Sequence, residues 1–213
     1  MQQWSKNFAT YLLGLIILTL GISLTIQSQL GASPFDALLV GLYRTFGLSI
    51  GSWEIVVGFT IVVANAIAVK QRPELTALLT SFITGIGIDT WLVIQRPWLE
   101  MSQLFGQSLV LILGIVLSGI GIAIYLESSF APNPMDRSMV ILTDKTNWSL
   151  GRSRAIISVV LVIIALFFHG DVGVGTLLNA LTSGIVIQFA RPYVQMIQKK
   201  LQTASASVRY DTK

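Results

Sequence analysis

Apolar residues fill six stretches of this chain, and polar and charged residues mostly lie between them. A hydrocarbon layer about 30 Å thick is crossed by a helix of about 20 apolar residues, which rises 1.5 Å per residue. Five stretches have 18 to 20 residues, and the fifth, at 155–168, has 14 and extends back through Arg152 and Arg154 if those side chains reach the headgroups. We therefore predict six transmembrane helices, at residues 8–27, 52–69, 75–94, 108–126, 155–168 and 173–190.

Two shorter helices are predicted in the links that follow the first and fourth stretches. The links contain Ser33-Pro34-Phe35-Asp36 and Asn133-Pro134-Met135-Asp136. A serine or asparagine N-cap, a proline in the first turn and a carboxylate near the positive end of the helix dipole are all typical of a helix start. These short helices should cover residues 34–46 and 134–146.

The two links belong to an internal repeat, because the chain matches itself when it is shifted by 100 residues. Between positions 13 and 51, eleven residues are identical to their counterparts, among them three glycines, a proline and an aspartate. An apolar composition alone does not produce such matches. An odd number of crossings per copy inverts the second copy. The predicted fold is all-α and integral to the membrane, with inverted repeats at 1–100 and 101–198 and a disordered cytoplasmic tail at 199–213.

The composition agrees with this class and excludes several chemistries. The chain is 53% hydrophobic and only 11% charged, which is typical of a polytopic membrane protein. It has no cysteine and one histidine, so we expect no disulfide, no metal site and no cofactor. A net charge of +4 is small, and we expect the bilayer rather than nucleic acid as its surroundings.

The basic residues predict the orientation of the helices. With six crossings, twelve lysines and arginines fall on one side and only Arg44 and Arg96 on the other. Such an excess marks the cytoplasmic side. Both termini should therefore be cytoplasmic.

The paired Pro-x-Asp links are the first candidate site, formed by Ser33, Asp36, Asn133 and Asp136. In one interpretation the aspartates only cap two helices that lie at the membrane interface. In the other the links re-enter the membrane, and two helix N-termini point at a central cavity. The helix N-termini favour an anionic solute, whereas the aspartates favour a cation or a proton. The sequence leaves these alternatives open.

Other ionisable residues near the predicted spans also match across the repeat. Glu54 corresponds to Arg154, and the two form an ion pair only if both lie near the repeat axis. Glu127 corresponds to Gln27 and Asp89 to Gln188. Interfacial solvation is the simpler interpretation for Glu54, Arg154 and Glu127. Asp89 fits either the outer surface or a polar vestibule.

Motifs of catalysis are missing from the sequence. There is no phosphate-binding loop, no pair of histidines at helical spacing, no cysteine nucleophile and no serine flanked by glycines. The two aspartates that match best occupy equivalent positions at helix starts, not complementary ones. We therefore expect a protein that is not an enzyme.

The six spans, the doubled Pro-x-Asp links and Gly-Val-Gly-Thr before the last helix resemble the YczE/YyaS/YitT family of bacterial multi-pass membrane proteins. The resemblance covers residues 8–195. The chain is expected to be of the short, YczE-like branch, because it has no counterpart of the soluble C-terminal domain of the YitT branch. The resemblance implies a location in the bacterial plasma (inner) membrane, and it implies no substrate.

Two classes of function remain. A small secondary transporter or flippase, with a site between the repeats for an unidentified solute, ion or lipid, explains the repeats and the broken helices. The alternative is a non-transporting subunit or regulator, such as the substrate-capturing component of a larger transporter. A mass of 23.2 kDa is small for alternating access, so a homodimer is also considered.

Overall fold

A computed structural model describes residues 2–97, 103–128, 130 and 133–210, with side chains from residue 7 to 198 within those ranges. All regular structure in this described part is helical. The eight helices are α1 (Gln2–Gln27), α2 (Pro34–Phe46), α3 (Ile50–Val69), α4 (Leu75–Gln95), α5 (Leu104–Glu127), α6 (Pro134–Thr146), α7 (Leu150–Phe167) and α8 (Val174–Tyr210).

Five of these helices are long and apolar enough to cross a membrane, where the sequence predicted six. They are α1 from Asn7, α3, α4, α5 and α7. The sixth predicted span lies in α8, which is not one of the five. The sixth crossing therefore remains a prediction.

The last helix is also longer than the sequence predicted. α8 continues to Tyr210, through most of the segment expected to be a disordered tail, and residues 211–213 lie outside the described part. Residues 199–210 contain lysine, leucine, glutamine, alanine and arginine, which favour helices, and no proline or glycine to end one.

The two short helices match their predicted ranges, because the chemistry that starts them is local. The Ser33 hydroxyl accepts a hydrogen bond from the backbone N–H of Asp36, and the Asn133 side chain accepts one from Met135. α6 begins 100 residues after α2, and α7 begins 100 residues after α3. The order long helix, short helix, long helix, long helix thus occurs twice.

α1 and α5 cross as an antiparallel pair, and the contacts between them are reciprocal. A Cβ atom at Gly21 would lie 2.7 Å from the carbonyl oxygen of Gly114, and one at Gly121 would lie 2.8 Å from that of Gly14. Only glycine allows two helix backbones to approach so closely. Positions 14 and 21 of α1 thus meet 121 and 114 of α5, which are their own counterparts in exchanged order.

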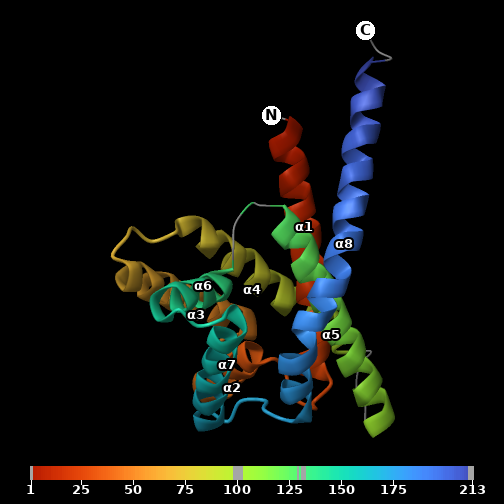
Figure 1. Cartoon of the computed structure of the whole chain (residues 1–213). Helices are drawn as coiled ribbons and strands as arrows, with labels where there is room; N and C mark the ends of the chain where they lie inside the picture. Colours follow the sequence, from red (N-terminus) through yellow and green to blue (C-terminus); the bar gives the residue numbers. More distant parts are fainter. Residues whose placement is uncertain (1, 98–102, 129, 131–132, 211–213) are drawn as a thin grey trace.

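Two further pairs of helices pack crosswise between the two halves of the chain. α2 packs on α7 through a small apolar cluster that includes Ala37, Leu38 and Ala165. α6 packs on α3, where the Asn65 side chain donates to the carbonyl oxygen of Pro134. Figure 1 shows the long helices α1, α5 and α8 on one side of the molecule, and α2, α3, α6 and α7 beside them.

The last two helices of the first half are closed against each other. A Cβ atom at Gly51 of α3 would lie 2.0 Å from the carbonyl oxygen of Gly85 on α4. One at Gly58 would lie 2.2 Å from the Ser81 hydroxyl. This contact between α3 and α4 is called the closed seam below.

The corresponding helices of the second half are apart. A Cβ atom at Gly151 of α7 would meet nothing within 4 Å, and one at Gly184 of α8 would meet only a guanidinium nitrogen of Arg154, at 3.9 Å. α7 and α8 make no packing contact comparable to that of α3 and α4. This separation between α7 and α8 is called the open cleft.

Candidate functional site

A central cavity of about 140 Å³ is lined by residues from all eight helices. Both Pro-x-Asp links face it, and so do side chains of α7 and α8 on either side of the open cleft. A second cavity, between α3, α4 and α6, measures only about 20 Å³, enough for about one water molecule. The central cavity is therefore the candidate site.

The lining of the central cavity follows the repeat. Most of its residues have their counterpart, 99 or 100 positions later, in the same lining. These pairs are Leu18 and Ser118, Ile22 and Ile122, Ser33 and Asn133, Phe35 and Met135, Asp36 and Asp136, Glu54 and Arg154, and Thr84 and Ser183. The cavity thus lies where the two halves of the chain meet.

Six of the eight predicted site residues are brought together here: Ser33, Asp36, Glu54, Asn133, Asp136 and Arg154. In the sequence the two links are 100 residues apart, and only the crosswise packing brings their N-termini to one space.

Asp36 is held by the start of its own helix. Its side chain is 5% exposed and accepts a hydrogen bond of 2.5 Å from the Ser33 hydroxyl. The same serine oxygen accepts from the backbone N–H of Asp36 at 3.2 Å. This reciprocal bonding orients the carboxylate at the positive end of the α2 dipole.

Asp136 is held differently, by a tyrosine from another helix. Tyr125 of α5 donates its hydroxyl to Asp136 at 2.6 Å, and its side chain is almost fully buried. Sequence reasoning did not identify Tyr125, because its counterpart is Thr25 and the repeat gives no reason to single it out. The two aspartates are equivalent in sequence but not in their partners.

Glu54 is the least satisfied charged group of the cavity. It is 2% exposed, and within the described part of the chain its carboxylate accepts no hydrogen bond. The nearby carboxylate of Asp36 repels that of Glu54 electrostatically. Nearby on the lining, the Thr84 hydroxyl is also buried and has no hydrogen-bond partner. Buried polar groups without partners are costly, so they point to a site that something else fills.

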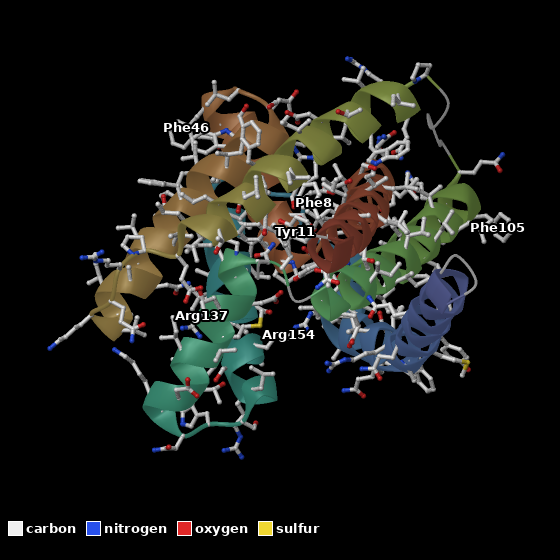
Figure 2. The ribbon with its side chains drawn as sticks, turned by 90° about the horizontal axis from the view of Figure 1, so that it is seen from above. Phe8, Tyr11, Phe46, Phe105, Arg137 and Arg154 are labelled. Atoms are coloured by element: carbon white, nitrogen blue, oxygen red, sulfur yellow. The ribbon has the colours of Figure 1, made fainter. Side chains whose placement is uncertain are left out.

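Arg154 faces the cavity from α7 and bridges the open cleft. It donates to the hydroxyl of Ser183 on α8 at 3.0 Å, and it interacts electrostatically with Asp136. Figure 2 shows Arg154 between the teal ribbons of α6 and α7 and the green and blue ribbons of α5 and α8. The ion pair with Glu54 that the sequence suggested is absent among the described residues, because each side chain lies on its own wall of the cavity.

The other two predicted residues lie away from the cavity. Glu127 forms a salt bridge of 2.6 Å with Arg191, near the end of α5. Asp89 joins the closed seam, where it accepts hydrogen bonds from the Ser49 hydroxyl at 2.5 Å and from the backbone N–H of Gly51 at 2.8 Å. Asp89 therefore ties α4 to the start of α3.

The chemistry of this lining suits the binding of a polar or charged molecule. Carboxylates, one guanidinium, hydroxyls and the amide of Asn179 alternate with apolar walls. No group of three or more metal-ligating side chains occurs in the described part of the chain. Asn179 and Ser183 were not among the predicted site residues, although the repeat pairs Ser183 with Thr84.

Five apolar helices around a polar cavity define a multi-pass helical membrane protein. Within that class, the chain belongs to the family described as "Family of unknown function (DUF6198)", whose model matches residues 5–192.

Comparison with curated proteins agrees with this family. The chain is 42% identical to Uncharacterized protein YyaS of Bacillus subtilis over 189 residues, 89% of this chain and 94% of that protein. It is 33% identical to Uncharacterized membrane protein YczE of the same organism over 210 residues, 98% of this chain and 96% of that protein. No solved structure matches. The predicted resemblance to the YczE and YyaS proteins is confirmed.

Proposed function

We propose that this protein is a small secondary transporter or flippase, and that its substrate binds in the central cavity. The observation that carries the proposal is the meeting of both Pro-x-Asp helix starts at one cavity, whose lining also holds Glu54 without a hydrogen bond and which adjoins the open cleft. Broken helices whose N-termini converge on a polar site are typical of transporters built from repeats.

An inverted arrangement of the two halves supports the proposal. Gly14 contacts Gly121, which is the counterpart of Gly21. A two-fold axis then requires Gly21 to contact Gly114, which is the counterpart of Gly14. The glycines of α1 and α5 obey this rule, and the two helices are antiparallel. The proposed axis therefore lies in the membrane plane, and α8 supplies the sixth crossing. The start of α1 and the end of α8 lie toward the same end of the molecule (Figure 1).

The unequal seams supply the proposed conformational change. Under the repeat, the closed seam of α3 and α4 corresponds to the open cleft of α7 and α8. In an inverted repeat the opposite state exchanges the two, so that the cavity is reached from the other side. Asp89 then releases Ser49 and Gly51, and α7 packs on α8 at Gly151 and Gly184.

The proposed location follows from the positive charges. Six crossings with both termini in the cytoplasm leave Arg44 as one of two basic residues on the outer side. We place the protein in the bacterial inner membrane on this basis. A catalytic role is not part of the proposal: the Ser33 hydroxyl bonds to Asp36 as part of a helix cap, and the sequence has no cysteine nucleophile.

Flux through the cavity tests the proposal. Proteoliposomes should take up at least one of three labelled probes, ethanolamine, glycine or phosphate, faster than empty liposomes. Asp36→Asn and Asp136→Asn should each lower that rate at least about tenfold, since losing one charge-assisted contact costs about 1.5–3 kcal/mol. The control is Asp144→Asn, an exposed position of α6, which should retain the wild-type rate.

Unchanged uptake in both cavity variants would reduce the two aspartates to helix caps. The alternative role, a non-transporting subunit or regulator, predicts a partner chain that co-purifies in mild detergent. Native mass spectrometry distinguishes that result from a monomer, and from the homodimer that the small size of the chain suggests.

A further inference from the structure

The charged groups of the central cavity are unequal in sign. Its described lining holds three carboxylates, Asp36, Glu54 and Asp136, and one guanidinium, that of Arg154. Arg154 interacts with Asp136, which also accepts from Tyr125. Among the described residues, no cationic side chain forms a salt bridge with the carboxyl groups of Asp36 or Glu54.

The geometry points to a primary ammonium group as the ligand that completes the Asp36 and Glu54 wall of the cavity. This inference rests on the proposed function and names the substrate class of the same site. Burying a carboxylate without a cation or a hydrogen bond is unfavourable, and a ligand cation supplies what the fold omits.

Hydrogen bonding separates a primary ammonium from other cations. Glu54 accepts no hydrogen bond within the described residues, so it has acceptor sites for N–H donors. The buried Thr84 hydroxyl, which lacks a partner, is a further acceptor on the lining. A quaternary ammonium has no N–H to donate. The described residues contain no group of three or more side chains that could hold a metal ion.

The rest of the ligand should be short and apolar. Leu18, Ile22 and Phe35 face the same cavity, and an alkyl chain buried against them loses contact with water. The cavity is lined by both α7 and α8, and these helices also carry exposed apolar side chains such as Val159 and Leu181. An amine dissolved in water and the aminoethyl headgroup of a membrane lipid share this chemistry.

Calorimetry on the purified full chain in detergent tests the inference with four probes of similar size. Butylammonium should bind, whereas butanoate, butanol and tetramethylammonium should not. Glu54→Gln should weaken butylammonium binding at least about tenfold, because the amide carries no charge. Glu54→Asp should retain part of the affinity. Asp144→Asn, an exposed carboxylate away from the cavity, should bind like the wild type.

A second arm identifies the source of the ammonium group. The protein is placed in nanodiscs of phosphatidylethanolamine or of phosphatidylcholine, and retained lipid is measured by native mass spectrometry. Retention of phosphatidylethanolamine alone, with its displacement by butylammonium, supports a lipid headgroup. Butylammonium binding that is equal in both lipids supports a free amine.

Binding of butanoate as tight as that of butylammonium, or wild-type affinity in folded Glu54→Gln, would overturn the inference. So would the failure of butylammonium to bind the folded wild type. These measurements need no flux. If butylammonium binds but no probe is taken up by proteoliposomes, the transporter proposal is rejected and the ammonium site is retained. If phosphate alone is taken up, the transporter proposal is retained and the ammonium site is rejected.

Discussion

Gly21→Ala is expected to destabilise the protein by about 1–3 kcal/mol, the usual cost of overpacking a well-packed interior. The new methyl group would lie 2.3 Å from the backbone nitrogen of Ser118 and 2.7 Å from the carbonyl oxygen of Gly114. No rotamer change can relieve a clash with backbone, so α1 and α5 must separate. The midpoint of thermal unfolding in detergent, followed by size-exclusion chromatography, measures the loss.

The repeat supplies both a replicate and a control for this experiment. Gly121→Ala should cost a similar amount, because its methyl group would lie 2.4 Å from the backbone nitrogen of Leu18. Gly151→Ala should leave stability unchanged or raise it, since nothing lies within 4 Å and alanine favours helix. If Gly21→Ala unfolded at the temperature of Gly151→Ala, close packing of α1 on α5 would be rejected.

Local sequence chemistry predicted both short helices and, to within one residue, the C-terminal ends of α1, α3, α4, α5 and α7, whereas α1, α5 and α7 start four to six residues before the predicted positions. Ser33 and Asn133 cap their helices through their own side chains, within three residues, so the ranges 34–46 and 134–146 needed no tertiary information. The long helices follow from the run of apolar residues in the same way. α8 is the exception, because it continues past the apolar run and through Pro192, and residues 199–210 contain no further proline or glycine to end it.

The meeting of the two links could not be predicted from either link. It depends on the crosswise packing of α2 on α7 and of α6 on α3, which no local pattern records. For the same reason the sequence ranked Glu127 and Asp89 with the cavity residues. Both are matched across the repeat, but a partner on a neighbouring helix, Arg191 or Ser49, holds each of them elsewhere.

Residues that correspond in the repeat do not have the same surroundings. Under the proposed function, this asymmetry between the two copies bears on how the cavity is reached. Glu54 and Arg154 are counterparts, yet one is buried without a hydrogen bond and the other bridges the cleft to Ser183. Two copies in identical conformations would leave the cavity equally accessible from both sides. Under the proposed inverted repeat, unequal conformations of the two copies would close one path and open the other, as alternating access requires.

Engineered disulfides are expected to detect the exchange of the two seams without knowledge of the substrate. The sequence has no cysteine, so any disulfide that forms must join the introduced cysteines. Ser49→Cys with Asp89→Cys should form a disulfide rapidly, because the side-chain oxygens of these residues are 2.5 Å apart across the closed seam. Electrophoresis without reductant measures the fraction crosslinked.

The counterpart pair, Ser149→Cys with Gln188→Cys, is the decisive one. Both positions are exposed at the open cleft, and no hydrogen bond joins them in the described structure. If the seams exchange, this pair should also form a disulfide, more slowly, each time α7 closes on α8. Oxidising the first pair should hold the closed seam and reduce probe uptake to the level of empty liposomes, and reductant should restore it. A counterpart pair that stays reduced while the first pair crosslinks fully would mean that the cleft is fixed, and alternating access would then be wrong for this protein.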